Sequence, residues 1–498
     1  MRESGILLPI SSLPSKYGIG CFDEEAYRFV DTLSEAKQTY WQILPLGITS
    51  YGDSPYQSYS TFAGNPYFIS LNALCEKGWL NKDDLPEENI NSNYVDYVFL
   101  YETRYPLLKK AYYNSDIRKC DAFIEYCYES RWWLDDYALF MAIKENYNHV
   151  SWDQWDDSVR LRDEKMLKHY TDVLEEEITY HKFIQFIFWS QWKELKIYAN
   201  SKGVKIIGDI PIYIAYDSCD VWANPSLFQL DENVRPTAIA GCPPDGFSAT
   251  GQLWGNPLYN WKKHEISNFK WWISRIKYCT EHYDVVRIDH FRGFDEYYAI
   301  PYGEETAING HWEKGPGMKL FHAIEQELGK INVIAEDLGY LTDTVKKLVE
   351  DSGYPGMKLL QFGFDSRDSS GALLYQPHNY IENSVAYTGT HDNETMMGWF
   401  TSITSDEKQD LLRYLNLDNV EDEIILDACI ELLMKCVSKM CLIPMPDWLK
   451  LDNSARMNTP NTIGNNWKWR MKKDAFTQEL VRKIIEMTCL GNRTGNYM

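Results

Sequence analysis

The sequence predicts an α/β fold, a closed (β/α)₈ barrel, and three observations lead to this prediction. Eight short apolar runs are spread along the chain. Stretches with helical spacing of apolar residues separate most of them, and such alternation implies parallel pairing of the strands. Eight units is the number that closes a barrel of this kind. A doubly wound open sheet is the alternative, but no G-x-G-x-x-G motif follows the first run.

The predicted strands are rich in apolar and β-branched residues, as buried parallel strands require. They cover residues 5–10, 40–46, 204–213, 285–291, 331–336, 357–362, 384–388 and 441–445. Apolar residues at intervals of three and four predict the helices. These cover residues 23–37, 183–201, 264–282, 318–329 and 342–351, with further helices across 405–439.

The chain organisation predicted from these elements is a barrel with two additions. Residues 1–75 and 181–498 are expected to form the barrel, and no C-terminal β-domain is expected after it. Residues 76–180 mix charged residues with Trp, Tyr and Leu at helical intervals, which predicts a helical insertion subdomain. Residues 214–262 are rich in Pro, Gly, Asp and Trp and predict an irregular substrate-binding loop subdomain, because loops this long are usually functional.

Composition and charge restrict the partners and the compartment. The chain has 498 residues, 44 % of them hydrophobic, and a net charge of −22, which repels nucleic acid and anionic membranes. Eleven cysteines are scattered without a C-x-x-C pair, so no zinc or redox site is expected and a reducing cytoplasm is predicted. The apolar run at the N-terminus is too short for a signal peptide. No run approaches the roughly 20 apolar residues of a membrane span.

The predicted strand at 285–291 carries the first candidate site residues. Side chains alternate along a strand, so Arg287 and Asp289 point to the same face. If that face is the inside of the barrel, the arginine favours the ionised form of Asp289, because a nearby opposite charge stabilises it. An ionised, oriented carboxylate suits a nucleophile. A structural ion pair at a strand end is the alternative for this stretch alone.

Acidic residues also follow other predicted strands. Chemistry in such barrels lies at the carboxyl ends of the strands. These ends carry Asp209, Glu336-Asp337 and His391-Asp392-Asn393-Glu394, in addition to Arg287 and Asp289. One carboxylate as nucleophile and one carboxylic acid as proton donor are what the cleavage of a glycosidic bond requires.

The residues around these acids resemble the motifs of a known family. Val286-Arg-Ile-Asp-His-Phe-Arg-Gly293, Ile334-Ala-Glu-Asp-Leu-Gly339 and Gly389-Thr-His-Asp-Asn-Glu-Thr395 are similar to the catalytic motifs of the α-amylase clan. The details resemble the amylomaltases, the 4-α-glucanotransferases of glycoside hydrolase family 77. Further motifs that carry this resemblance are Ser11-Ser-Leu-Pro14, Ser54-Pro-Tyr-Gln-Ser58, Gly208-Asp-Ile-Pro211, Pro243-Pro-Asp245, Gly251-Gln-Leu-Trp-Gly-Asn-Pro257, Ser454-Ala-Arg-Met-Asn-Thr-Pro460 and Asn466-Trp-Lys-Trp-Arg470.

The resemblance implies a role for each acid. Asp289 is the implied nucleophile, which forms a covalent glycosyl-enzyme. Glu336 is the implied proton donor, which then activates the acceptor. Asp392 is implied to hold the 2- and 3-hydroxyls of the sugar at the cleavage point. The chemistry agrees with this division, because a second carboxylate nearby raises the pKa of Glu336 while Arg287 keeps Asp289 charged.

Secondary residues follow from the same resemblance. Asp209, Arg287, His290 and His391 are implied to line the sugar subsite; for the two histidines, a structural role is the alternative. Tyr56 is similar to a stacking tyrosine of the family. Gln252 and Trp254 lie where the family has a flexible lid, and for Trp254 plain loop packing is the alternative.

The resemblance implies a retaining 4-α-glucanotransferase that moves α-1,4-glucan segments between maltooligosaccharides and starch- or glycogen-derived glucans, with no cofactor. No metal site is expected, because adjacent residues such as Glu336 and Asp337 point to opposite faces of a strand and no D-x-[DN]-x-[DN]-G loop occurs. One alternative is an α-glucan hydrolase of the same clan. Another is a glucan-binding protein that has lost catalysis, although such a protein is expected to have lost at least one of the three acids.

Overall fold

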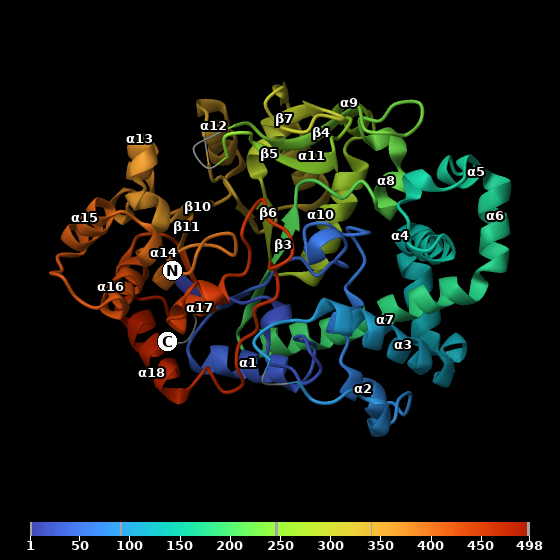
Figure 1. Cartoon of the computed structure of the whole chain (residues 1–498), viewed down its shortest axis with the longest axis horizontal. Coiled ribbons are helices and arrows are strands. Elements are labelled where there is room, and N and C mark those ends of the chain that lie inside the picture. The colour runs from blue at the N-terminus through green and yellow to red at the C-terminus, as the bar shows by residue number, and fades with distance from the viewer. Residues whose placement is uncertain (1, 90–91, 245–247, 340, 496–498) are drawn as a thin grey trace.

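The centre of the molecule is a closed barrel of eight parallel strands (Figure 1). The computed structural model describes residues 2–89, 92–244, 248–339 and 341–495. Around the barrel the strands follow the order β1-β12-β11-β10-β9-β6-β3-β2, and each neighbouring pair for which a register is given is parallel. The predicted (β/α)₈ fold is confirmed. The barrel strands are β1 (Glu3–Leu7), β2 (Tyr40–Gln42), β3 (Lys205–Pro211), β6 (Val285–Asp289), β9 (Val333–Ala335), β10 (Gly356–Leu359), β11 (Ser384–Tyr387) and β12 (Met440–Pro444).

Most strands end a few residues before the predicted ends, and β6 shows one reason. His290 has a φ of 54°, in the left-handed region, so the extended backbone stops at Asp289. A short 3₁₀ helix, Phe291–Phe294, follows at once. The polar residues at 289–292 therefore lie in a turn at the mouth of the barrel.

Helices surround the barrel at most of the predicted positions. The predicted helix 264–282 is two helices, because Asn268 and Phe269 between them both have positive φ values, which an α-helix does not accommodate. The helices outside the insertion are α1 (Glu24–Glu35), α8 (Cys219–Ala223), α9 (Trp261–Ile266), α10 (Lys270–His282), α11 (Met318–Leu328), α12 (Asp343–Ser352), α13 (Ser369–Ala372), α14 (Met396–Ser402), α15 (Ser405–Leu415), α16 (Asp422–Lys435), α17 (Met445–Trp448) and α18 (Gln478–Leu490).

The region predicted as a helical insertion, residues 76–180, contains helices and no named strand among its described residues. They lie together on the right-hand side of the view in Figure 1. The long α7 begins inside this region and continues to Ser201, so it crosses the boundary predicted at residue 180. The helices here are α3 (Tyr97–Asn114), α4 (Asp121–Asn146), α5 (Asp157–Arg160), α6 (Glu164–Val173) and α7 (Glu175–Ser201), and α2 (Leu71–Glu76) ends where the region begins.

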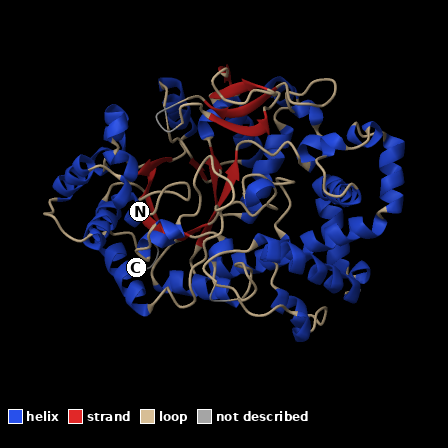
Figure 2. Ribbon diagram, viewed as in Figure 1, coloured by secondary structure: helices blue, strands red, loops and turns tan. Residues whose placement is uncertain are grey.

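A second, antiparallel sheet corrects the expectation that residues 214–262 are irregular. β4 (Ala238–Cys242) and β5 (Gln252–Pro257) lie in this region and pair with each other. β4 also pairs with β7 (Glu296–Pro301), which pairs with β8 (His311–Lys314). Figure 2 shows this sheet apart from the barrel, at the top of the view. The β4–β7 pairing that joins the two halves of this sheet reaches across β6 in sequence, so the residues of 214–262 alone do not predict it.

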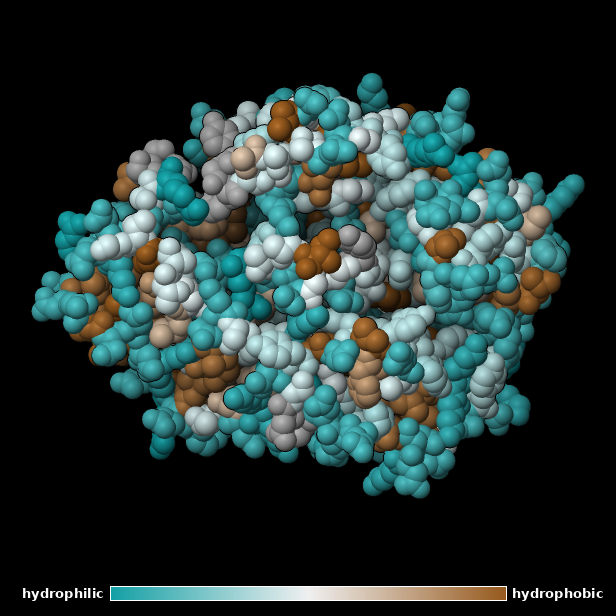
Figure 3. Space-filling model, viewed as in Figure 1, coloured by the Kyte–Doolittle hydropathy of each residue, from teal (hydrophilic) through white to brown (hydrophobic). Residues whose placement is uncertain are grey.

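Apolar side chains from the strands fill the barrel interior. They include Tyr40, Ile207, Val285, Ile334, Met357, Val385 and Leu442, all buried. The space-filling view shows a mainly hydrophilic surface with a hollow near its middle, below the antiparallel sheet (Figure 3). In the described part of the chain no helix is both long and apolar enough to cross a bilayer. The described residues after β12 form helices and no further named strand.

Candidate active site

Strand alternation carries the predicted acids to the inside of the barrel mouth. Val285 belongs to the interior cluster, so Arg287 and Asp289, two and four residues further on, face the same way. The same step of two leads from Ile207 to Asp209 on β3, and from Ile334 to Glu336 just after β9. Three neighbouring strands therefore deliver three carboxyls and one guanidinium to one place.

Arg287 is the cation at the centre of this cluster, and two carboxylates share it. Its Nη1 donates to both carboxylate oxygens of Asp209, at 2.8 and 2.7 Å. Its Nη2 lies 3.0 Å from Oδ1 of Asp289. Arg287 and Asp209 are 2 % and 0 % exposed, whereas the side chain of Asp289 is 28 % exposed. The predicted contact of Arg287 with Asp289 is present, and Asp289 is the carboxylate that a ligand can reach.

The protonation of the acid pair differs from the expectation that Arg287 simply keeps Asp289 ionised. Burial raises the pKa of Asp289, and the charges of Glu336 and Asp209 raise it further against the opposing effect of Arg287. Burial also raises the pKa of Glu336. Burial is the larger cause in both carboxyls, and for Asp289 the charge of Arg287 only partly offsets it because Asp209 shares that cation. Asp289 and Glu336 therefore stay protonated to higher pH than ordinary carboxyls do.

Two backbone N–H groups orient the carboxylate of Glu336. The amide of His290 donates to Oε2 at 2.7 Å, and the amide of Leu338 donates to Oε1 at 2.8 Å. The left-handed turn at His290 brings the first of these amides back over the barrel mouth. The neighbouring Asp337 is used elsewhere, because its Oδ1 accepts a bond from the amide of Met357 at 2.7 Å. As predicted, these adjacent acids do not serve the same site.

Asp392 is held by the C-terminal part of the chain. Its Oδ1 accepts a bond from the Asn458 side chain at 2.6 Å, and its backbone carbonyl accepts one from Arg456 at 2.9 Å. Its Oδ2 lies 3.3 Å from Nε2 of His391. The Asp392 side chain is 41 % exposed, so it keeps a face for a ligand. Asn458 and Arg456 were not predicted as site residues, although the quoted motif 454–460 contains both.

Tyr56 connects the Arg287 cluster to His391. Its hydroxyl lies 2.7 Å from Oδ2 of Asp209 and 2.8 Å from Nε2 of His391. The Tyr56 and His391 rings stack at 5.3 Å with an interplanar angle of 16°. Burial lowers the pKa of His391, so its imidazole is neutral and serves as a hydrogen-bonding and packing group.

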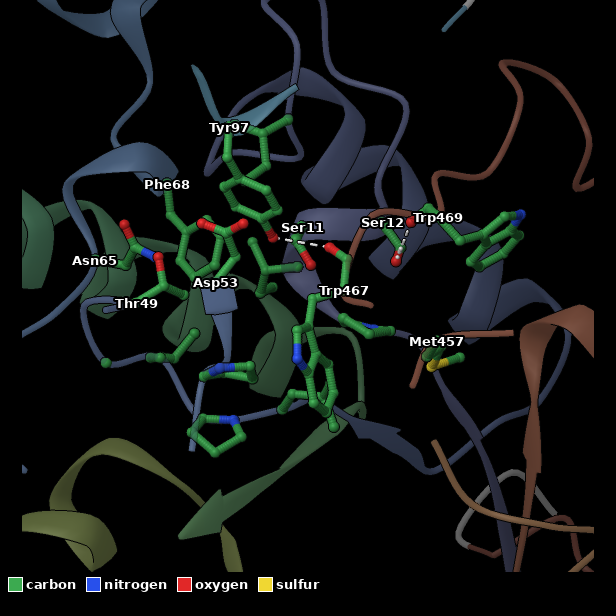
Figure 4. A pocket seen from close by; sticks show the side chains of 18 residues that line it. Ser11, Ser12, Thr49, Asp53, Asn65, Phe68, Tyr97, Met457, Trp467 and Trp469 are labelled. Atoms are coloured by element: carbon green, nitrogen blue, oxygen red, sulfur yellow. Dashed lines mark hydrogen bonds between the residues drawn. The ribbon is translucent and has the colours of Figure 1, made fainter. Parts of the chain in front are cut away.

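Trp467 is an aromatic residue of the site that the sequence analysis did not single out. Its ring lies 5.6 Å from that of Tyr56 and 5.9 Å from that of His391. In the neighbouring pocket of Figure 4, the Tyr97 hydroxyl donates to the Trp467 carbonyl at 2.8 Å. The loop that carries Tyr56, the start of α3 and the segment that carries Trp467 therefore meet beside the acids. The motif 466–470 contained Trp467, but nothing local indicated its partners.

Trp254 lies at a β-bulge that aims its ring at the site. Gly241 pairs with Leu253 and Ile239 pairs with Pro257, so β5 has extra residues opposite β4 between these pairs. Bulges of this kind redirect a side chain. The Trp254 ring meets the edge of the His290 ring at 4.8 Å, and its indole N–H donates to the Gln252 side chain at 3.0 Å. Burial lowers the pKa of His290 to about 3, so this imidazole is also neutral.

Contacts therefore link the predicted residues in two series. Asp289, Arg287, Asp209, Tyr56, His391 and Asp392 form one continuous series of hydrogen bonds and ion pairs. Gln252, Trp254, His290 and Glu336 form the second. Asp245, from the Pro-Pro-Asp motif, lies outside the described residues.

Comparisons with known proteins agree with this geometry. A sequence profile of the 4-alpha-glucanotransferases, glycoside hydrolase family 77, matches residues 8–476. A 4-alpha-glucanotransferase from Clostridium butyricum is 50 % identical over 488 residues, covering 97 % of this chain and 99 % of the relative. One from Thermus thermophilus is 45 % identical and covers 96 % of both chains. An amylomaltase from Streptococcus agalactiae, solved in complex with acarbose, superposes with a TM-score of 0.94 at 44 % identity, covering 99 % of this chain and 100 % of that one.

The barrel and its acid cluster define a (β/α)₈ enzyme with a carboxylate-rich site at the carboxyl ends of its strands. The matches extend over nearly the whole chain. Their sequence identities are well above those of proteins that share only a fold. The chain belongs to the 4-alpha-glucanotransferase family, glycoside hydrolase family 77. The predicted family and the predicted enzyme class are confirmed.

Proposed function

We propose that this chain transfers α-1,4-glucan segments between maltooligosaccharides, and that Asp289, Glu336 and Asp392 carry the reaction. Asp289 attacks the anomeric carbon and forms a covalent glycosyl-enzyme, while Glu336 protonates the departing oxygen. Glu336 then deprotonates the hydroxyl of an acceptor sugar, which displaces Asp289. The observation that supports this most is the reachable Asp289 carboxylate on Arg287, beside a carboxyl whose pKa burial raises.

The division of labour rests on how each carboxyl is held. Asp289 lies 3.0 Å from a cation and its side chain is 28 % exposed, which suits a nucleophile that a substrate must reach. Two backbone amides orient Glu336. To act as the acid, Glu336 must carry a proton at the moment when the glycosidic oxygen departs. Asp392 is fixed by Asn458 at one oxygen and presents its exposed face to the sugar hydroxyls. Asp209, Arg287, His290 and His391 shape the same subsite.

Transfer rather than hydrolysis requires that a sugar reaches the glycosyl-enzyme before water does. Water is present at roughly 55 M, but a well-oriented bound group reaches effective molarities of about 10⁵ M or more. Tyr56 and Trp467 on one side, and Trp254 with Gln252 on the other, supply aromatic surface for such an acceptor. Closure of these aromatic side chains over a bound acceptor would exclude water from the site.

The location we propose for this activity is the cytoplasm.

Product analysis from maltotriose tests the proposal. Fed maltotriose alone, the enzyme should release glucose and build a ladder of longer glucans while the number of reducing ends stays nearly constant. A steady rise in reducing ends, with maltose and glucose as end products, would identify a hydrolase instead. Trp254→Ala should raise the hydrolytic share. If it lowers both reactions equally, the ring only binds substrate and does not exclude water.

A further inference from the structure

A groove on the outside of the barrel lies between α4, α7 and α10, apart from the acid cluster. Its volume is about 730 Å³. That lies within the roughly 300–1,000 Å³ typical of ligand sites. Residues of all three helices line it, including Trp132 on α4, Trp189 on α7 and Tyr278 on α10. Neither the active-site acids nor the residues that contact them line this groove.

Aromatic rings form one part of the groove lining. Trp132 is 50 % exposed, which is unusual for so large a ring. Trp133 and Trp189 are buried, and their indole nitrogens have no hydrogen-bond partner in the described part of the chain. These two rings form the floor of the groove, and Trp132 is the indole that a ligand can reach.

The charges of the lining cancel. Three lysines and three glutamates contribute to it, in a chain whose net charge is −22. Burial lowers the pKa of His282, which also lines the groove, to about 3, so it adds no charge. A charged polymer finds no complementary potential here, whereas a neutral polyhydroxylated ligand finds donors and acceptors of both kinds. The charged residues are Glu125, Glu129, Lys193, Lys196, Lys277 and Glu281.

The groove backs onto the loop that carries Tyr56. Trp189, Tyr278 and His282 line both the groove and a cavity of about 50 Å³ that Tyr56 and Asp209 line on its other side. Phe62, six residues after Tyr56, contacts Trp132 edge to face at 4.8 Å. Its carbonyl also accepts a bond from the Tyr278 hydroxyl at 2.9 Å. One aromatic wall therefore separates the groove from the acid cluster.

We propose that this groove is a non-catalytic binding site for an α-1,4-glucan chain. The inference rests on the proposed function, since it takes the occupant to be the polymeric form of the same substrate. The apolar C–H face of a glucose ring stacks on the exposed Trp132 indole, and the ring hydroxyls bond to the polar and charged side chains of the rim. A polymer held there raises the local concentration of its own free ends at the active site.

The test compares polymer and short substrate in Trp132→Ala. In native gels containing amylopectin, this variant should lose several-fold in retardation relative to the parent, and its KM for amylopectin should rise several-fold. Its kcat and KM for maltotriose should stay at the parental values. Tyr128→Ala is the matched control, because Tyr128 lies one turn away on α4, is 66 % exposed and does not line the groove.

A second variant keeps the test independent of the Phe62 contact. Ser274→Arg fills the groove from α10 and leaves the aromatic wall intact, so it should reproduce the loss of retardation. Retardation of the parent should change little between about 50 and 500 mM salt, because the ligand is neutral. A steep salt dependence would point to a charged partner and overturn the inference.

The remaining outcomes separate this inference from the proposed function. Equal retardation and equal KM for amylopectin in the parent and both groove variants overturn the groove as a glucan site. A parallel loss on maltotriose and amylopectin in Trp132→Ala also overturns it, because Trp132 then acts through Phe62 on the catalytic loop. A parent that is retarded by amylopectin but does not disproportionate maltotriose supports the groove and refutes the proposed function.

Discussion

Two buried cations in this molecule have opposite uses, and the number of carboxylates around each explains the difference. Arg287 faces Asp209 and Asp289 together, and Glu336 lies close enough to raise the pKa of Asp289. Lys144 on α4 is paired with Asp217, at 2.6 Å, and also donates to the Val150 carbonyl at 3.0 Å. An excess of acids holds a proton ready for chemistry, whereas a matched pair is only a structural contact.

The Lys144 pair ties the helical insertion to the barrel. Asp217 follows β3, and the Lys144 ammonium also lies 4.8 Å from the centre of the Tyr59 ring, in the loop that carries Tyr56. Burial lowers the pKa of Lys144, and Asp217 opposes that shift. The two cations are therefore similarly buried, but their sites differ in charge balance and in the exposure of the acids, which the following variants are designed to test.

The largest expected effect is on turnover. Asp289→Ala removes the proposed nucleophile and should lower kcat on maltotriose by about 10⁴-fold or more, in the range seen when a covalent nucleophile is removed. Asp217→Ala should lower the melting temperature and leave kcat within about tenfold, because it touches no reacting group. Glucose release and thermal melting measure the two effects. Equal loss of turnover in both variants would show that the distinction between the sites is wrong.

Glu336→Gln tests where the proton is used. Turnover of maltotriose should fall to background, because neither the leaving oxygen nor the acceptor finds its proton carrier. A maltosyl fluoride donor needs no proton on its leaving group, so the variant should accumulate a covalent adduct on Asp289. Mass spectrometry of the intact protein detects it. Absence of the adduct would assign the acid role to another residue.

Removal of each cation should cost more stability where the carboxylate left behind is more deeply buried. Arg287→Met leaves the fully buried Asp209 without its ion pair, which costs roughly 3–5 kcal/mol of stability. Lys144→Met leaves Asp217, whose side chain is 30 % exposed and reaches water, so a smaller loss of about 1–3 kcal/mol is expected. Urea unfolding measures both free energies. The reverse order would contradict the burial argument.

The pH dependence tests the shared proton. Activity needs one proton on the Asp289–Glu336 pair, and raised pKa values keep it bound to higher pH, so activity should fall as pH rises through those values. Asp209→Asn removes a negative charge and leaves Arg287 to Asp289. The pKa of the pair then falls, and the alkaline limb of kcat/KM should move to lower pH by about one unit.

Two histidines and a distant acid serve as the checks on this limb. The pKa of His290 is about 3 and that of His391 is lowered, so neither imidazole titrates on the alkaline side. Asp217→Asn should leave the limb in place. Movement of the limb to higher pH in Asp209→Asn would refute the charge-excess explanation.

The smallest expected effect comes from one hydroxyl. Tyr56→Phe keeps the ring that stacks on His391 but loses the bonds to Asp209 and His391. A loss of roughly 1 kcal/mol, about fivefold in kcat/KM, is expected. Tyr59→Phe keeps its ring beside Lys144 and should behave as the parent. An effect of Tyr59→Phe as large as that of Tyr56→Phe would mean that the whole loop, rather than the Tyr56 hydroxyl, sets the rate.

The sequence by itself determined the barrel, the positions of its strands to within a few residues, and which acids follow them. Local runs of apolar residues predict where the strands lie. The alternation of side chains along a strand is enough to place Val285, Arg287 and Asp289 on one face. The motifs around Asp289, Glu336 and Asp392 are also local, so the family could be predicted before the strands were assembled.

Only the tertiary structure decided how these groups are paired. Tyr56 and His391 are 335 residues apart in sequence, and Asp392 and Asn458 are 66 apart, so no local pattern specifies these bonds. The antiparallel sheet that carries Trp254 likewise depends on strands that pair across β6. The charge balance at Arg287 follows from strand pairing, because Asp209 and Arg287 are 78 residues apart in sequence and become neighbours only when β3 pairs with β6. Local sequence selects the element, whereas the contacts that tune a pKa depend on which elements become neighbours.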